Sequence, residues 1–224
     1  MPLGIIFVGD DYLITVSLKR NSIIDTFEKG KIKGLFTYKK TRFLLQMLYL
    51  NAVHYLDALK KINKQAEFTV GILKKSMTNK ELIQLLNLEN SLVYITTSLK
   101  ANEIVMEKTL RGKIIKMYEE DEDILEDAII ENRQAIEMSK TYSDILSGTM
   151  DAYASIISNN LNVVMKVLTS VTLIISLPTL IASFWGMNVV LPFQNSPYGF
   201  LVITGISIII SAIAYVLFKR KNMV

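Results

Sequence analysis

The sequence predicts a mainly α-helical membrane protein with a small, truncated α/β part at its N-terminus and two membrane-spanning helices at its C-terminus. The stretch from Val167 to Phe218 contains no Asp, Glu, Lys, Arg or His. Long runs with helical periodicity precede it, and a short run of strand-like residues opens the chain. These three observations define the predicted fold class.

The uncharged stretch divides into two apolar runs. They are Val167–Phe184 and Gly199–Phe218, and each is close to the roughly 20 residues that a helix needs to cross the hydrocarbon layer. We therefore expect a first transmembrane helix over 163–184, an external loop over 185–198 and a second transmembrane helix over 199–218.

The flanking charges predict the orientation of the spans. A basic tail over 219–224 opens with Lys219-Arg220-Lys221, and Lys166 precedes the first span, while the link between the spans has no basic residue. The positive-inside rule then places both termini in the cytoplasm of a multi-pass plasma-membrane protein. This orientation explains the net charge of +4, so we expect no nucleic-acid partner.

The residue types argue against an enzyme. The chain has no cysteine, which excludes disulfides and thiolate metal sites. It also shows no catalytic Ser/His/Asp set, no phosphate loop and no HExxH motif. The lone histidine, His54, is expected to be a surface or interhelical residue.

Residues 1–40 are predicted to be the remnant of a cytoplasmic α/β domain. Strand-like runs flank a turn at Gly9-Asp10-Asp11, which predicts a β-hairpin over 3–17. A short helix is expected near 22–29. Two strands alone are marginally stable in water, so we expect the remainder of the sheet to be missing.

Residues 41–118 are predicted to form a long antiparallel helical hairpin in the cytoplasm. Thr78 and Glu81 have the spacing of a capping box, which marks the start of the second helix. Because the link is so short, the two helices must run antiparallel. Residues of a coiled-coil seam recur every seven positions at Leu45, Ala52, Leu59, Ala66 and Leu73, and the complementary positions are Leu48, Tyr55, Ile62 and Thr69. The second helix repeats the pattern at Leu85, Leu88, Leu92, Ile95, Leu99, Asn102 and Met106.

A stalk helix is predicted over 119–162. It begins in the acidic cluster Glu119–Asp123, where carboxylates favour a helix start. No proline lies between Asp121 and Pro178, so the helix can continue into the first span. About 60 residues at about 1.5 Å each would make a helix of about 90 Å.

Polar and small side chains form one stripe along the first span. Their 3-4 spacing places them on one helix face, and a carboxylate three turns earlier shares that face. Such a stripe can line a pore, but Ser and Thr also serve helix packing, and the second span has a short stripe of its own (Thr204, Ser207 and Ser211). The predicted pore-lining residues are Asp151, Asn162, Met165, Thr169, Thr172, Ser176 and Thr179, with Ser183 on the same face.

Three segments together resemble the signature of the CorA family of divalent-cation channels. They are Asp144–Asp151, Asn162–Thr169 and Pro178–Asn188, and the last ends in Gly186-Met187-Asn188. The resemblance implies a homopentamer in the lipid bilayer with the first span lining the pore. It also implies transport of Mg²⁺ into the cytoplasm, with Gly186, Met187 and Asn188 at the outer mouth.

The same resemblance implies control by cytoplasmic Mg²⁺. Asp127 matches a stalk carboxylate that helps to bind regulatory Mg²⁺ between subunits, and Asp151 matches an acidic ring at the inner mouth. Gly186 is expected to allow a tight backbone at the outer mouth.

The chain departs from the family pattern in three places. Trp185 replaces the usual Tyr or Phe, and the external link carries no acidic residue. The chain also begins late relative to the family. We therefore expect the pore to be kept and its regulation to be altered. Two alternatives stay open: transport of Co²⁺, Ni²⁺ or Zn²⁺, and a non-conducting, membrane-anchored coiled-coil protein.

Overall fold

The structure is a computed structural model that describes residues 3–9, 12–30, 32, 36, 38–76, 78–112, 115–189 and 196–221. The chain divides into two compact units, Met1–Met150 and Asp151–Val224. Each unit is described by itself.

The first unit opens with the predicted β-hairpin. Strands β1 (Leu3–Val8) and β2 (Tyr12–Ser17) pair antiparallel. Gly9 has a φ of 54°, the left-handed conformation that glycine adopts at no steric cost; Asp10 and Asp11 of the predicted turn lie outside the described residues. Helix α1 (Ser22–Glu28) follows, and the Asn21 side chain accepts a hydrogen bond from the Ile23 backbone N–H at its start.

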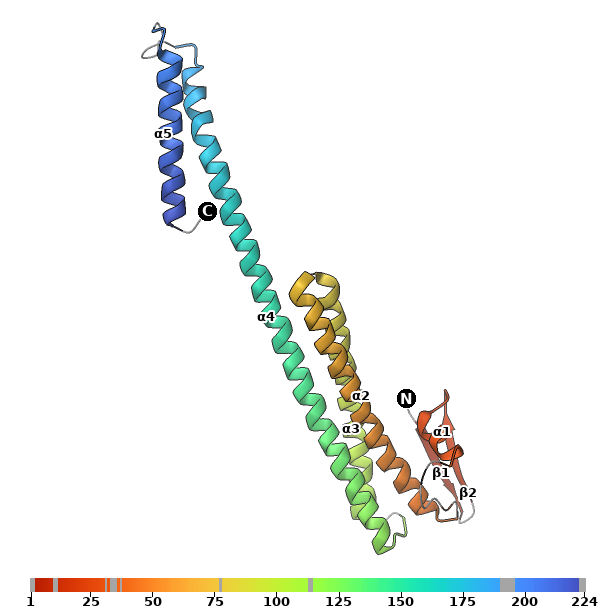
Figure 1. The fold of residues 1–224 in the computed structure, drawn as a ribbon. Coiled ribbons are helices and arrows are strands. Elements are labelled where there is room, and N and C mark those ends of the chain that lie inside the picture. The colour runs from red at the N-terminus through yellow and green to blue at the C-terminus, as the bar shows by residue number, and fades with distance from the viewer. Residues whose placement is uncertain are drawn as a thin grey trace. The chain divides into compact units, whose positions relative to one another are not determined.

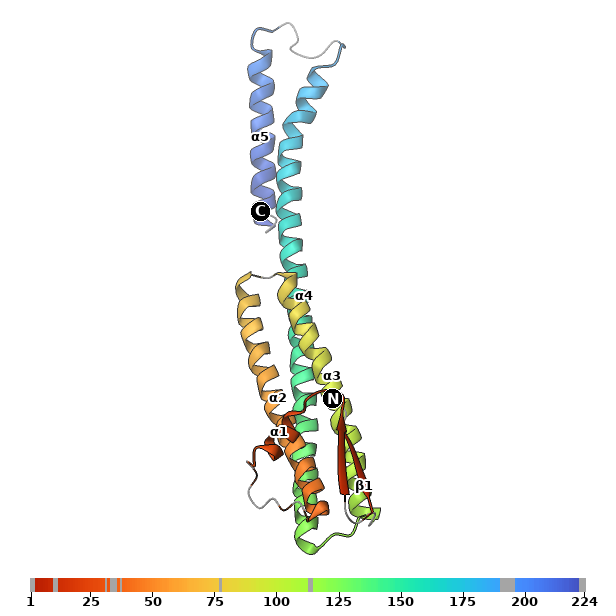
Figure 2. The same ribbon diagram turned by 90° about the vertical axis from the view of Figure 1, so that its right-hand side faces the viewer.

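Helices α2 (Lys40–Ser76) and α3 (Asn79–Gly112) lie side by side in this unit (Figures 1 and 2). The Thr78 hydroxyl donates to the Glu81 carboxylate, so the two residues of the predicted capping box are in contact at the start of α3. The seven-residue repeats of both helices face inward, and their buried members are Leu45, Ala52, Leu59, Ala66, Leu73, Leu85, Leu92, Leu99 and Met106.

Helix α4 (Glu119–Trp185) is the long helix predicted from the acidic cluster. Its first part packs on both helices of the hairpin, in a cluster where Leu45 and Met106 meet Leu125. Two buried polar side chains of α4 also donate hydrogen bonds to backbone carbonyls of α3. Asn132 Nδ2 donates to the Leu99 carbonyl at 3.0 Å, and the Ser139 hydroxyl donates to the Leu92 carbonyl at 3.2 Å.

Ion pairs connect the same helices at the surface. The Arg133 guanidinium lies 2.7 Å from the Glu103 carboxylate and 2.5 Å from that of Glu107. Hydrogen bonds to these two carboxylates raise the pKa of Arg133. Because Arg133 is exposed, the pair contributes little to stability, and the apolar seam holds the helices together.

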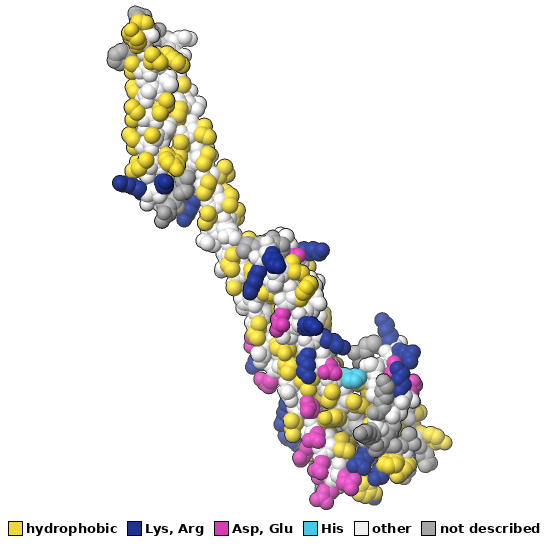
Figure 3. Space-filling model, in the orientation of Figure 1, with side chains coloured by type: hydrophobic (Ala, Val, Ile, Leu, Met, Phe, Trp, Pro, Cys, Tyr) yellow, Lys and Arg dark blue, Asp and Glu magenta, His cyan; other side chains and the backbone are white. Residues whose placement is uncertain are grey.

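The second unit contains the last part of α4 and helix α5 (Gly199–Arg220), which lie side by side (Figures 1 and 2). Both helices are long and apolar enough to cross a membrane. Hydrophobic side chains cover the visible face of this unit, and Lys and Arg gather at one end of it (Figure 3). The mainly helical class with a small two-stranded sheet is therefore confirmed.

Leu99→Ala should test the apolar seam. Leu99 has no exposed surface, so its truncation should lower the free energy of unfolding by about 2–5 kcal/mol. The measurement is chemical unfolding of the detergent-purified chain, followed by circular dichroism.

Leu86→Ala is the matched control. Leu86 lies on the same helix and is 47% exposed, so its loss should cost less than about 1 kcal/mol. Equal costs for the two variants would contradict the assignment of the buried face.

Candidate functional site

In the second unit α4 lies beside α5 (Figures 1 and 2), and one face of α4 is less exposed than the rest. Ser170 has no exposed surface. Ile174, Leu177 and Ile181 are half-buried and follow it at helical spacing. On α5 the half-buried residues recur every three or four positions, at Ile203, Ser207, Ser211, Ala214 and Phe218. These two rows form the contact between the spans.

The predicted polar stripe lies on the opposite face of α4. Thr179 is nine residues from Ser170, and at about 100° per residue this separation places it half a turn away. Every predicted member is exposed in the single chain: Asp151, Asn162, Met165, Thr169, Thr172, Ser176 and Thr179. The contact with α5 therefore does not use these side chains.

Part of the stripe lines an open groove of about 670 Å³. The hydroxyls of Thr172, Ser176 and Thr179 lie along it, between the apolar side chains of Ile175, Leu180 and Phe184. Ser183 also lines this groove, in agreement with its expected face.

Three hydroxyl groups of the stripe donate their hydrogens to carbonyls of their own helix. Thr172 Oγ1 donates to the Leu168 carbonyl at 2.8 Å, and Thr179 Oγ1 donates to the Ile175 carbonyl at 3.1 Å. Ser176 Oγ donates to the Leu173 carbonyl at 2.9 Å. Because each hydrogen is used in the helix, the oxygen lone pairs are left as acceptors on the open side. Oxygen acceptors are the groups that hard cations prefer.

The stripe of the second span has a different environment. Ser207 and Ser211 are half-buried in the row that faces α4, whereas Thr204 is exposed. Two of its three hydroxyls therefore belong to helix packing, the use that polar residues commonly have between spans. The first span's stripe differs because none of its predicted members is buried.

The Gly186-Met187-Asn188 tripeptide lies directly after the last residue of α4, and all three residues are exposed. The Gly186 N–H donates to the Ala182 carbonyl at 2.9 Å. A Cβ on Gly186 would meet that carbonyl oxygen at 3.4 Å, an ordinary contact, and the φ of Gly186 is outside the left-handed region. The expected tight backbone is therefore not a feature of the single chain.

Asp127 lies in the other unit, on the first part of α4, and is exposed. Among the described residues, no group of three or more His, Asp or Glu could hold a metal ion. A Mg²⁺ ion bound at Asp127 would therefore need further oxygen ligands from water or from a second copy of the chain.

Sequence reasoning missed one polar member of the stripe. Ser158 is exposed and lies seven residues after Asp151 and four before Asn162, so it shares their face. The 3-4 spacing would have found it if the stripe had been extended toward Asp151. His54, as expected, lies between elements, with Nδ1 3.3 Å from the Ser22 hydroxyl.

A helical unit followed by two apolar helices, the first with an open polar face, is typical of a membrane protein with two spans, such as a transporter. The family model "CorA-like Mg2+ transporter protein" matches residues 3–220. The chain belongs to this family, whose members are transporters and not enzymes.

Two curated relatives carry the description "Cobalt/magnesium transport protein CorA". The one from Methanocaldococcus jannaschii is 28% identical over 98% of this chain and 71% of its own length. The one from Thermotoga maritima is 29% identical over 85% of this chain and 55% of its own length. The chain thus spans little more than half the length of the second relative.

Solved structures of the first relative are also similar. The complete CorA magnesium transporter from M. jannaschii matches with a TM-score of 0.84 and 28% identity, covering 95% of this chain and 68% of that one. The soluble domain of the same transporter matches with a TM-score of 0.60 and 25% identity, covering 66% of this chain and 61% of the other.

The absence of cysteine from the chain allows a direct test of the stripe. In membranes, Thr172→Cys and Thr179→Cys should react with a charged, water-soluble thiol reagent, because their face would border water. Ser170→Cys should stay unreactive, because this position is buried against α5.

Val171→Cys is the informative control. Val171 is exposed in the single chain but lies about 100° around the helix from Thr172, between the stripe and the α5 face, where lipid would exclude the reagent. If it reacts as fast as Thr179→Cys, the stripe has no special access to water.

Proposed function

We propose that this chain forms a channel that conducts Mg²⁺ across the plasma membrane into the cytoplasm. The observation that carries the proposal is the polar stripe of α4, which lies on the face opposite α5 and is exposed along its whole length. Family membership supports transport as the activity.

A single stripe cannot enclose a path for ions, so the proposal requires several copies around an axis. Closed rotational symmetry is the usual arrangement of such assemblies. The resemblance to the CorA family implies five copies, each with α4 toward the axis and α5 toward lipid. The burial of the α4 face against α5 supports this arrangement, because it leaves the stripe as the side available for the axis.

The charges of the second unit support an orientation with both termini in the cytoplasm. Lys219 and Arg220 end α5, and Lys166 precedes the apolar part of α4, at the same end of the hairpin. The described residues 185–189 and 196–198 of the link carry no charge. The positive-inside rule favours the basic end as cytoplasmic.

The two ends of the stripe suit a hydrated divalent cation. Mg²⁺ gives up its water reluctantly, so the neutral amide of Asn188 can accept hydrogen bonds from a hydrated ion at the outer mouth. Asp151 would provide a carboxylate ring at the inner mouth, where negative charge attracts cations. Between them, the hydroxyl oxygens of the stripe offer acceptors.

The outer mouth can be tested in liposomes. Wild-type protein should take up Mg²⁺ under a gradient, measured with an entrapped Mg²⁺-sensitive dye. Asn188→Ala should lower the rate by about tenfold or more, equivalent to losing about 1.4 kcal/mol of ion stabilisation. Thr204→Ala, which alters an exposed hydroxyl on α5, should leave the rate unchanged.

Absence of any uptake by the wild type would contradict transport, and equal rates for wild type and Asn188→Ala would contradict the role of this residue. The first result would favour the non-conducting, membrane-anchored alternative.

A different cation is a second candidate. Both curated relatives are described as cobalt/magnesium transport proteins, which favours Co²⁺ over Ni²⁺ or Zn²⁺. The stripe offers oxygen ligands and no imidazole or thiolate, a set typical of Mg²⁺ sites. Competition of Co²⁺ with Mg²⁺ in the same liposomes would rank the two ions.

Control of the channel by cytoplasmic Mg²⁺ is part of the proposal. Asp127 lies on the helix that continues as the first span, so an ion shared between copies at this carboxylate would restrain that helix. A bound Mg²⁺ bridging like-charged copies would favour a closed pore, and its loss would free the helices.

Protease protection tests this role. Millimolar Mg²⁺ should slow cleavage of α4 in the wild type by several-fold more than in Asp127→Ala. Glu126→Ala removes the adjacent exposed carboxylate and should behave as the wild type does. Equal protection of the wild type and Asp127→Ala would remove Asp127 from the regulatory site.

A further inference from the structure

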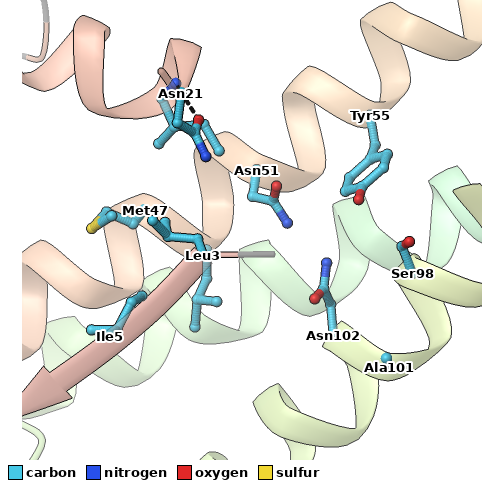
Figure 4. A pocket seen from close by; sticks show the side chains of 11 residues that line it. Leu3, Ile5, Asn21, Met47, Asn51, Tyr55, Ser98, Ala101 and Asn102 are labelled. Atoms are coloured by element: carbon cyan, nitrogen blue, oxygen red, sulfur yellow. Dashed lines mark hydrogen bonds between the residues drawn. The ribbon is translucent and has the colours of Figure 1, made fainter. Parts of the chain in front are cut away.

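The first unit contains a cavity of about 400 Å³ that transport does not use. It lies between strand β1, the start of α1 and one face each of α2 and α3 (Figure 4). All of its lining residues belong to the first unit and are described. A volume of this size lies within the range of small-molecule sites.

One wall of the cavity is polar and carries no charge. Asn51 and Tyr55 come from α2, and Ser98 and Asn102 come from α3. In Figure 4 the amides of Asn51 and Asn102 point into the space between the two helices. The Asn21 side chain completes this wall, with its oxygen already bonded to the Ile23 N–H at 2.9 Å.

Three of these five polar side chains have no hydrogen-bond partner among the described residues, whereas the Ser98 hydroxyl donates to the Tyr94 carbonyl at 2.9 Å. The side chains of Asn51, Tyr55 and Asn102 are half-buried, and no hydrogen bond joins any of them to another side chain or to the backbone in the described part of the chain. A half-buried amide without a partner is unfavourable unless water or a ligand supplies one. Two facing amides provide both donors and acceptors at the same place.

The opposite wall is apolar. Leu3 and Ile5 of β1 and Met47 of α2 form it. Leu3 and Ile5 pack against the buried cluster around Ile23 and Phe27, so this wall is part of a fixed core. A ligand that fits both walls has an apolar face and a hydrogen-bonding edge.

No Lys, Arg, Asp, Glu or His lines the cavity among the described residues. An ion or a phosphate would lose its hydration there without a countercharge, which is costly. A ligand that suits this lining is neutral, with an apolar face and paired donors and acceptors at its edge, and a nucleobase has these properties. Asparagine amides recognise the adjacent donor and acceptor of adenine in this way.

We propose that this cavity binds the base of a nucleoside, with Asn51 and Asn102 pairing with its edge and the Leu3–Ile5 wall covering its face. A neighbouring pocket of about 270 Å³ shares Asn51 and Tyr55 with the cavity and adds Arg20 and His54. The base could come from a free nucleoside or from a nucleotide. The phosphate of a nucleotide would then lie in the neighbouring pocket, toward Arg20. Arg20 is already paired with Asp25 at 2.8 Å, which favours the uncharged nucleoside.

The test uses the full chain, purified in detergent, and does not depend on transport. Equilibrium dialysis with radiolabelled adenosine, guanosine, cytidine and uridine measures binding, and adenosine monophosphate and ribose are run in parallel. Asn51→Leu and Asn102→Leu keep the side-chain size but remove the amide. Asn90→Leu, on an exposed position of the same α3 helix, is the matched control.

The wild type should bind at least one nucleoside saturably at micromolar to millimolar concentrations, and ribose should not bind. Asn51→Leu and Asn102→Leu should weaken binding by about tenfold or more, the effect of losing one well-placed hydrogen-bonding group, and Asn90→Leu should bind as the wild type does. Melting followed by circular dichroism establishes that the variants fold, and both cavity variants should melt at or above the wild-type temperature, since an unpaired amide has been removed.

Three outcomes would overturn the proposal. They are the absence of saturable binding by every nucleoside, equal binding of ribose, and unchanged affinity in a folded Asn102→Leu variant. Tighter binding of adenosine monophosphate than of adenosine would keep the base site and overturn the preference for the uncharged ligand.

Discussion

The contact between α4 and α5 in the second unit decides which side of the first span is free. Ser170 is fully enclosed in this contact, and a small side chain at such a position lets two helices approach closely. Because α5 occupies this face, the half turn around Thr179 is left without a partner within the chain. The position of α5 beside α4 therefore determines which face of the first span can conduct ions.

Hydrogen bonding inside the spans gives this face its chemistry. In a membrane every backbone polar group must be satisfied within the protein, which is why the spans are helical. The Thr and Ser hydroxyls of the stripe donate to helix carbonyls within one turn. At Thr172, Ser176 and Thr179 the stripe thus presents oxygen acceptors, without any charged residue between Val167 and Phe218.

In the first unit, apolar repeats hold α2, α3 and α4 together, and a few buried polar groups fix the register of these helices. Leucine and alanine side chains at seven-residue intervals on α2, and leucines at the same interval on α3, are buried. Asn132 and Ser139 of α4 donate hydrogen bonds to carbonyls of α3. Buried polar groups of this kind specify register better than leucines do, since a shifted helix would leave them unpaired. The cavity lined by Asn51 and Asn102 lies beside this seam, next to the β-hairpin.

The sequence by itself determined the local features of this protein. Several of these features depend only on residues close together in the chain. They are the helix starts at Thr78 and in the acidic cluster, the turn at Gly9 and the two apolar runs. The common face of Asp151, Asn162 and Thr179 was likewise predictable, since it needs only the helical repeat of about 3.6 residues. Family membership could be inferred from the Gly-Met-Asn tripeptide because its place after the first span is also a local property.

Only the tertiary structure decided how similar stripes are used. Thr204, Ser207 and Ser211 have the same spacing as part of the first stripe, but Ser207 and Ser211 lie in the row that packs on α4. The cavity between Asn51 and Asn102 brings together residues about fifty positions apart. The seven-residue pattern predicts Asn102 as part of the helix seam, but it does not predict that Asn51 lies opposite. The physical reason is that periodicity defines which residues share a face, whereas the side that becomes buried depends on the shape and chemistry of the neighbouring helix.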